Sequence, residues 1–307
     1  MTAFSREQNQ KNGVIPKPKG GNQMFADLHC HTTFSDGSVS IGDLVQLSKK
    51  AGLDTIAVTD HDCLDAIDRA KVAGKRMGIN VIPGVELSST DGDKEIHILA
   101  YMMESPDRLQ GICHKNTLAR KQAATYISVK LMQSYPVHND LILGCAAGSK
   151  CVFKPHIMMS LMQAGYCTEL YGDVYHKLFD ANSPENVLIR TPKFPTPEEV
   201  IREIHDAGGI AILAHPTLYG DMSLVEKYIG YGLDGIEVWH PTASQEAIDT
   251  LLELAEKNNL LATGGSDFHG MFNREICTMG SCGMDETAFR ELEVFNAKKQ
   301  KAAKKAE

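Results

Sequence analysis

Short apolar runs separated by helical patterns divide most of the chain into repeating units. Seven such runs are rich in β-branched side chains, which is typical of buried strands. They are Met24–Leu28, Thr55–Thr59, Asn80–Ser88, Ile96–Tyr101, Gly209–Ala214, Gly235–Trp239 and Leu260–Gly264. Strands that alternate with helices favour a parallel sheet covered by helices, and polar residues at the ends of successive strands favour the rim of an α/β barrel.

Three of the intervening helices have clear end signals. One is predicted to begin after Ser40 and to end at Gly52, because a serine caps free backbone N–H groups and a glycine accepts the left-handed end. A second is predicted to begin after Thr196 and to end at Gly208. A third is predicted over Ser244–Asn258, with apolar side chains on one face.

The stretch 102–189 lacks the pattern of a strand followed by a polar residue and is mainly helical, for example over Leu118–Gln133 and His156–Ala164. We therefore predict a barrel interrupted by a helical insertion that covers its mouth. The predicted order is a flexible tail at 1–23, the first barrel part at 24–101, the insertion at 102–189, the second barrel part at 190–297 and a Lys-rich tail at 298–307.

Composition narrows the class of protein. The 307 residues are 43% hydrophobic and 23% charged, as in soluble globular proteins. A net charge of -8 excludes a general basic surface for nucleic acid. No apolar run approaches the roughly 18 to 20 residues of a membrane span, and the first 23 residues have no signal-peptide core. The eight cysteines form no C-x-x-C pair. We expect a cytoplasmic protein with reduced thiols, no membrane contact and no obligate protein partner.

Histidines and carboxylates follow the first two predicted strands. His29 and His31 lie two residues apart in an extended segment, so both side chains can reach one metal ion while Asp36 returns from the next loop. An isolated H-x-H is also compatible with surface or core histidines. The second strand is followed at once by Asp60 and His61, where a purely structural role gives little reason for successive polar residues.

The remaining strands repeat this feature. Glu86 lies inside an apolar run, where a buried carboxylate is costly unless it has a cationic partner. His97, His215, Asp267 and His269 lie at other strand ends. Any one of these could be a core histidine or a helix cap, but so many converging at strand ends favours a metal centre.

Five motifs, D-L-H-C-H-T-T-F-S-D-G, T-D-H-D, G-V-E, A-H-P and G-S-D-F-H, occur in this order and resemble the PHP (polymerase and histidinol phosphatase) superfamily of metal-dependent phosphoesterases. The resemblance implies a distorted (βα)7 TIM-like barrel of PHP type with three metal ions at its carboxyl-end rim. It implies that His29, His31, Glu86 and Asp267 bind the first ion, Glu86, His97 and His215 the second, and Asp36, His61 and His269 the third.

Mixed imidazole and carboxylate ligands suit Mn2+, the expected ion, and also Fe2+ or Zn2+. Bridging by Glu86 would hold two ions close enough to share a hydroxide nucleophile. We therefore expect a phosphoric ester hydrolase in which Glu86, His215 and Asp60 serve catalysis, with Asp60 supporting a ligand histidine rather than binding metal. Other nucleophiles are poorly supported, because the chain has no G-x-S-x-G motif and GCAAGSK at 144–150 lacks the P-loop spacing.

The barrel-plus-insertion layout resembles the TrpH-like subgroup, which hydrolyses nucleoside 3',5'-bisphosphates and trims RNA or oligonucleotide 5' ends. That resemblance implies that basic residues of the insertion bind the non-reacting phosphate. The matching positions are Lys154, His176 and Lys177, where ammonium and imidazole replace guanidinium. Exposed insertion lysines are the alternative. His240, after a strand, would contact substrate or hydrogen bond within the rim.

The expected reaction is hydrolysis of a small nucleotide or of a short RNA end. The alternatives are a cyclic phosphodiesterase acting on a phosphorylated sugar, a histidinol phosphatase, and a non-catalytic PHP module that binds metal only structurally.

Overall fold

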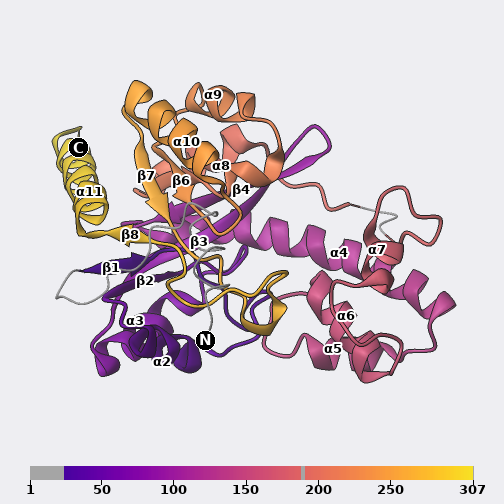
Figure 1. The fold of residues 1–307 in the computed structure, drawn as a ribbon. Helices are drawn as coiled ribbons and strands as arrows, with labels where there is room; N and C mark the ends of the chain where they lie inside the picture. The colour runs from indigo at the N-terminus through magenta and orange to yellow at the C-terminus, as the bar shows by residue number, and fades with distance from the viewer. Residues whose placement is uncertain (1–23, 188–190, 307) are drawn as a thin grey trace.

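A computed structural model describes residues 24–187 and 191–306, and the tail predicted at 1–23 lies outside these residues. The described chain has two parts, a barrel and a helical insertion to one side of it (Figure 1). No helix in the described ranges combines the length and apolar character that a bilayer crossing requires.

Eight strands form one sheet in the order β7-β6-β5-β4-β3-β2-β1-β8. Their bounds are Phe25–Asp27 (β1), Thr55–Val58 (β2), Asn80–Asp91 (β3), Lys94–Tyr101 (β4), Ile210–Leu213 (β5), Gly235–Trp239 (β6), Leu261–Gly264 (β7) and Met284–Asp285 (β8). The ends of the sheet approach each other where the Leu28 amide donates to the Gly264 carbonyl at 3.2 Å and Cys30 bridges Phe268. The result is a nearly closed barrel, so the predicted α/β fold of PHP type is confirmed.

The expectation of a wholly parallel sheet is wrong for β4. This strand runs antiparallel to both β3 and β5, because β3 and β4 form a hairpin instead of a strand-helix-strand unit. Gly92, with a φ of 61°, occupies the hairpin turn, where the left-handed conformation favours glycine. The two-residue strand β8, antiparallel to β1, was also not predicted.

The helices of the barrel are α2 (Ile41–Ala51), α3 (Ala66–Met77), α8 (Pro197–Asp206), α9 (Ser223–Ile229), α10 (Gln245–Asn258) and α11 (Glu286–Ala306). The predicted caps are confirmed: the Asp43 amide donates to the Ser40 hydroxyl, and Thr196 forms a capping box with Glu199. The residues 298–306, expected as a tail, are the last turns of α11. Phe289 and Leu292 of this helix pack into the core cluster that also contains Leu28 and Leu99.

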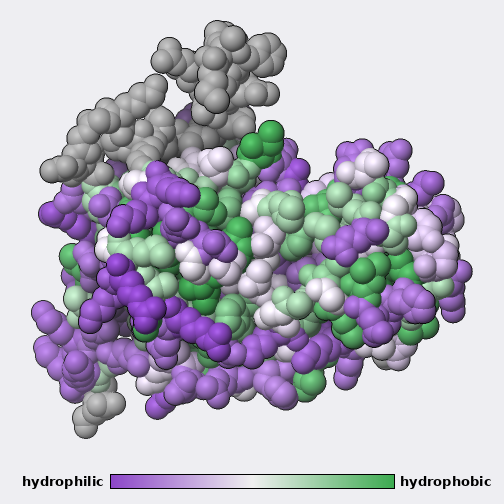
Figure 2. Space-filling view, turned by 90° about the horizontal axis from the view of Figure 1, so that it is seen from below, coloured by the Kyte–Doolittle hydropathy of each residue, from purple (hydrophilic) through white to green (hydrophobic). Residues whose placement is uncertain are grey.

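The insertion has its own core. Its helices are α4 (Gln110–Ser134), α5 (Asn139–Cys145), α6 (Lys154–Gln163) and α7 (Asp173–Phe179), preceded by a 3-10 turn at Pro106–Leu109. Leu131, Ile142, Met158 and Leu178 are buried together in it. Figure 2, seen from below, shows apolar side chains reaching the surface over the insertion among hydrophilic ones.

Candidate metal centre

The predicted histidines and carboxylates converge at one end of the barrel. His29 and His31 follow β1, His61 follows β2, Glu86 lies in β3 and His215 follows β5. His97 lies in the first half of β4, and because that strand is antiparallel its first half reaches the rim to which the other strands bring their carboxyl ends. Asp267 and His269 follow β7, and Asp36 lies in the loop between β1 and α2.

Glu86 is the centre of this group and is fully buried. Its Oε2 lies 3.3 Å from His29 Nε2, 3.2 Å from His31 Nε2 and 3.2 Å from His61 Nδ1. Its Oε1 lies 3.0 Å from both His97 Nδ1 and His215 Nε2. One carboxylate therefore contacts five imidazoles contributed by four different strands or their following loops.

Asp267 and Asp36 lie beside Glu86 and extend the cluster to one side. Asp267 Oδ1 is 3.4 Å from His29 Nε2 and 3.3 Å from His31 Nε2. Asp36 Oδ1 is 3.4 Å from His269 Nε2, and Asp36 Oδ2 is 3.8 Å from His61 Nε2. Three sets in the described chain bring donor atoms within 4.8 Å of one another: His31, Asp36, His61 and His269; His29, His31 and Asp267; and His61, Glu86 and His97.

Several buried atoms of the cluster have no hydrogen-bond partner within the described residues. They are His29 Nε2, His31 Nε2, His61 Nδ1, His215 Nδ1, Glu86 Oε2 and Asp36 Oδ1. Unpaired buried polar atoms are costly. Most of these atoms face one another across short distances with nitrogen and oxygen donors of the kind that bind divalent cations, so the residues fit metal ions well.

The buried charges favour an ionised Glu86. Burial opposes ionisation of Glu86, but His61, His29 and His97 outweigh it and hold the pKa of the Glu86 carboxyl well below its usual range. Burial lowers the pKa of the His61 imidazole to about 3, whereas the facing carboxylates overcome the effect of burial and raise the pKa of His31 and of His97 to about 10. Because imidazole ligands must be unprotonated, metal binding at this cluster would release protons.

The backbone at the rim is strained where two of these side chains enter. His215 has a φ of 30° and Asp267 a φ of 50°, in the left-handed region that non-glycine residues rarely adopt. At Gly265, a Cβ atom would lie 2.4 Å from the His29 backbone nitrogen, so only glycine fits there. Such strain persists where surrounding contacts fix the conformation, as at functional sites.

Two buried carboxylates behind the cluster hold it in place. Glu237 Oε1 lies 2.9 Å from His29 Nδ1, and Glu237 Oε2 accepts the His215 amide at 2.8 Å. Asp27 accepts the Ser266 amide and hydroxyl at 2.9 and 2.6 Å, which fixes the turn that leads into Asp267. Glu237 stands out in the sequence as a lone carboxylate in the apolar run GIEVW, and the hydrogen bonds within the rim expected for such a residue at a strand end are observed.

Asp60 is buried beside the cluster and binds the loop after β1. Its carboxylate accepts the Thr32 amide at 2.8 Å, the Thr32 hydroxyl at 2.7 Å and the Ser35 hydroxyl at 2.7 Å. Ser35 Oγ in turn lies 3.4 Å from His31 Nδ1. Asp60 therefore orders the loop after β1 and reaches His31 through Ser35 rather than by a direct contact.

Arg120 on α4 was missed by the sequence analysis. Its Nη2 donates to Ser88 Oγ at 2.7 Å and to Glu95 Oε1 at 3.0 Å, and Glu95 Oε1 lies 3.2 Å from His97 Nε2. The guanidinium carbon is 4.8 Å from the Phe153 ring centroid. Arg120 thus links the insertion to the cluster through Glu95, and no local motif marks this arginine because its contacts depend on how α4 packs on the barrel.

The four residues predicted to bind substrate differ in whether they contact the cluster. His240 is buried, with Nε2 3.4 Å from Asp267 Oδ2 and Nδ1 2.8 Å from Thr242 Oγ1. Lys154 begins α6, and its Nζ lies 5.7 Å from the Phe179 ring centroid. His176 and Lys177 are exposed on α7, and no contact described for them involves the cluster.

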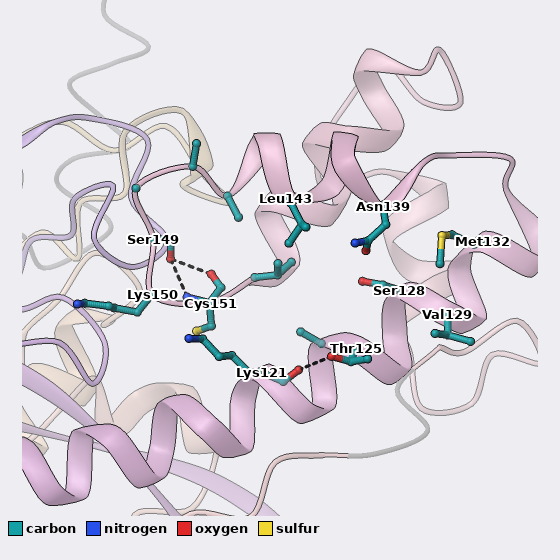
Figure 3. Close-up of a pocket in the computed structure, with 15 residues that line it drawn as sticks. Lys121, Thr125, Ser128, Val129, Met132, Asn139, Leu143, Ser149, Lys150 and Cys151 are labelled. Atoms are coloured by element: carbon teal, nitrogen blue, oxygen red, sulfur yellow. Dashed lines mark hydrogen bonds between the residues drawn. The ribbon is translucent and has the colours of Figure 1, made fainter.

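A separate cavity of about 810 Å³ lies on the insertion between α4, α5 and the loop at 146–152. Figure 3 shows Val129, Met132 and Leu143 along it and Lys121 and Lys150 toward one end. None of its lining residues belongs to the cluster, so the chemistry of the cluster does not extend into it.

Comparison with known proteins identifies relatives along most of the chain. A phosphoribosyl 1,2-cyclic phosphate 1,2-diphosphodiesterase of Eggerthella lenta is 31% identical over 82% of this chain and 96% of its own length. A 5'-3' exoribonuclease of Haemophilus influenzae is 30% identical over 79% of this chain and 89% of its own. A 3',5'-nucleoside bisphosphate phosphatase of Chromobacterium violaceum is 27% identical over 79% of this chain and 86% of its own.

The fold has solved counterparts as well. A Bifidobacterium adolescentis protein assigned as a metal-dependent phosphoesterase superposes with a TM-score of 0.78 at 30% identity, covering 89% of this chain and 96% of its own. The family model of the PHP domain matches residues 27–206. These relatives confirm the predicted reaction class, a metal-dependent phosphoric ester hydrolase, and the chain belongs to the PHP domain family.

Proposed function

We propose that this chain hydrolyses the phosphate ester of a small nucleotide, either a nucleoside 3',5'-bisphosphate or the 5' end of a short oligonucleotide. The observation on which the proposal rests is the contact of one buried carboxylate, Glu86, with five imidazoles at 3.0 to 3.3 Å. Relatives named as a bisphosphate phosphatase and an exoribonuclease support the substrate class.

The proposed centre holds three divalent ions, with Mn2+ expected and Fe2+ or Zn2+ as alternatives. The proposed ligands are His29, His31, Glu86 and Asp267 for the first ion, Glu86, His97 and His215 for the second, and Asp36, His61 and His269 for the third. The three compact donor sets support this assignment, since each overlaps one or more of these groups. When bound, such ions lower the pKa of water and neutralise phosphoryl oxygens.

The protein's own residues would position this chemistry. Glu237 and Glu95 fix the ring orientations of His29 and His97, because a carboxylate on the second ring nitrogen sets which nitrogen faces the cluster. Asp60 holds the loop that presents His31 and Asp36. In the reaction, water adds its oxygen to phosphorus, the ester P–O bond breaks, and the departing oxygen takes up a proton.

We further propose that the insertion covers the barrel mouth and selects the substrate. Its Phe153 ring stacks against His61 with centroids 5.8 Å apart, which brings the start of α6 to the edge of the cluster. Lys154 is the next residue, and we assign to it, with His176 and Lys177, the binding of an anionic group that does not react. His240, bonded to Asp267, would act within the rim.

A second candidate is a cyclic phosphodiesterase acting on a phosphorylated sugar, favoured by the name of the Eggerthella lenta relative and its 96% coverage. Histidinol phosphate hydrolysis and a non-catalytic metal-binding module are further alternatives. We expect metal analysis to find at least two ions per chain. We also expect kcat/KM on adenosine 3',5'-bisphosphate to exceed that on a ribose cyclic phosphate or histidinol phosphate by at least about tenfold, roughly 1.4 kcal/mol.

The measured kcat/KM values distinguish these candidate functions. A higher kcat/KM on the cyclic phosphate would replace the nucleotide by the sugar substrate. A folded protein that binds metal but hydrolyses none of the three would favour the non-catalytic module.

A further inference from the structure

A group of aromatic rings, here called the seam, lies between the insertion and the barrel and surrounds Arg274. Its members are Tyr171, Tyr175, Phe179 and Phe272. The Tyr171 hydroxyl, from the loop before α7, donates to the Phe272 carbonyl of the barrel at 2.6 Å. Arg274, two residues further along the barrel loop, donates from Nη2 to the Tyr175 hydroxyl at 2.7 Å. Its guanidinium carbon lies 5.5 and 5.4 Å from the Tyr171 and Tyr175 ring centroids. The guanidinium is therefore held in place although the residue is exposed.

Lys154 contacts the same set of rings. Its Nζ is 5.7 Å from the centroid of Phe179, and Phe179 is 5.0 Å from Tyr175. Burial lowers the pKa of the Lys154 ammonium, and the charges of Arg274 and Arg120 lower it further, although Glu95 opposes them. Two cations, one from the insertion and one from the barrel, thus lie near one set of rings.

Neither Lys154 nor Arg274 forms an ion pair with a carboxylate among residues 24–187 and 191–306. The other cation near the cluster, Arg120, is paired with Glu95. Placing two unpaired cations near each other is electrostatically unfavourable unless an anion binds between them. The chain as a whole is acidic, so a surplus of basic residues does not explain the arrangement.

The seam adjoins the metal cluster. The Phe272 ring lies 5.7 Å from His156 of α6, and Phe153 at the start of that helix stacks on His61. The charges of Asp36 and Asp267 reach Tyr171, where they help to raise the pKa of its hydroxyl above the usual range, after burial, which is the larger cause. An anion held between Arg274 and Lys154 would therefore sit beside the reacting centre, without touching Glu86.

We propose that Arg274, acting with Lys154, binds the second anionic group of the substrate and is the main determinant of specificity for substrates that have one. Arginine supplies the planar pair of donors that a phosphate accepts, which Lys154 cannot supply. The guanidinium expected in the insertion is thus provided by the barrel loop after β7. This inference rests on the proposed function and narrows it to esters with two separate anionic groups.

The test compares adenosine 3',5'-bisphosphate with p-nitrophenyl phosphate, which has no second anionic group, on the metal-loaded enzyme. For Arg274→Gln, we expect the ratio of kcat/KM between the two substrates to fall about 30-fold, as the loss of a charge-assisted pair of hydrogen bonds implies. Arg274→Lys should retain part of the ratio. Arg290→Gln, at an exposed arginine on α11 that pairs with Glu286, is the matched control and should leave the ratio unchanged.

The outcomes are distinguishable from failure of the proposed function. If wild-type enzyme hydrolyses both esters and Arg274→Gln lowers both rates by one factor, or neither, the inference is overturned while the phosphoesterase assignment stands. If wild-type enzyme with bound metal hydrolyses neither ester, the proposed function fails and the inference fails with it. Tyr175→Phe, which removes the hydroxyl that accepts from Arg274, should lower the ratio by a smaller factor of about threefold.

Discussion

The rim of the barrel and the insertion meet at one site but are built in different ways. At the rim the functional side chains are buried or partly buried and have several partners: Glu86 touches five imidazoles, and Glu237 holds two of the segments that present them. In the insertion, Lys154, His176 and Lys177 are exposed and have few partners. The rim is therefore suited to fixed chemistry and the insertion to selection among substrates, and changes at the two regions should have different consequences.

The largest effect is expected for Glu86→Gln. Removing the charge that five imidazoles share should lower metal content and reduce kcat by at least about 1,000-fold on every phosphoester, because a neutral amide cannot balance bound cations. Metal analysis, steady-state kinetics and circular dichroism would measure this. Glu253→Gln, on the exposed face of α10, is the control. Wild-type metal content and rate in Glu86→Gln would contradict the central position given to this residue.

Glu237→Gln should have the next largest effect, again on all substrates. The amide keeps the shape but weakens the contact with His29 Nδ1 and the acceptor for the His215 amide. Loss of such a supporting carboxylate typically costs 10- to 100-fold in metal affinity, roughly, or in activity. Titration with Mn2+ would measure the affinity. Partial rescue of the rate by excess Mn2+ is expected, whereas a loss of rate at full metal occupancy would assign Glu237 a direct part in the reaction.

The difference between the two regions also explains what the sequence could predict. Motifs such as D-L-H-C-H and G-S-D-F-H identified the rim because strands and the loops directly after them place neighbouring residues predictably. The seven longer strands were predicted as well, but β8 and the direction of β4 were not, since the latter depends on a tight turn at Gly92 rather than on hydrophobic pattern. Ser40 and Thr196 marked their helices through local hydrogen bonds.

Contacts between distant segments could not be predicted in this way. Arg120 lies in α4, whose apolar residues show no single face, and its contacts with Glu95 and Ser88 exist only once α4 packs against the hairpin. Arg274 follows the G-S-D-F-H motif but points to rings of the insertion about 100 residues earlier in the chain. Such residues have no local pattern, because their role depends on tertiary packing alone.

Arg120→Gln tests whether the two regions are coupled. The substitution removes the ion pair with Glu95 and leaves that carboxylate free to turn away from His97 Nε2. We expect kcat to fall about tenfold, with weaker binding of one of the bound ions only, seen as a change in the last step of a Mn2+ titration. Arg202→Gln, at an exposed position on α8, is the control. Equal weakening of all bound ions would argue for a general loss of packing instead.

The smallest effect is expected for Lys177, whose surroundings differ from those of Lys154. Both residues are exposed, but the ammonium group of Lys154 lies against the Phe179 ring, and its burial there lowers the Lys154 pKa. Lys154→Ala should lower the preference for adenosine 3',5'-bisphosphate over p-nitrophenyl phosphate about tenfold, and Lys177→Ala only about twofold, because solvent screens the ammonium of Lys177 more strongly than one packed against a ring. Lys115→Ala, at an exposed position on α4, should change neither rate. Equal effects of Lys154→Ala and Lys177→Ala would mean that the substrate spans both helices and that proximity to the cluster does not decide which cation binds it.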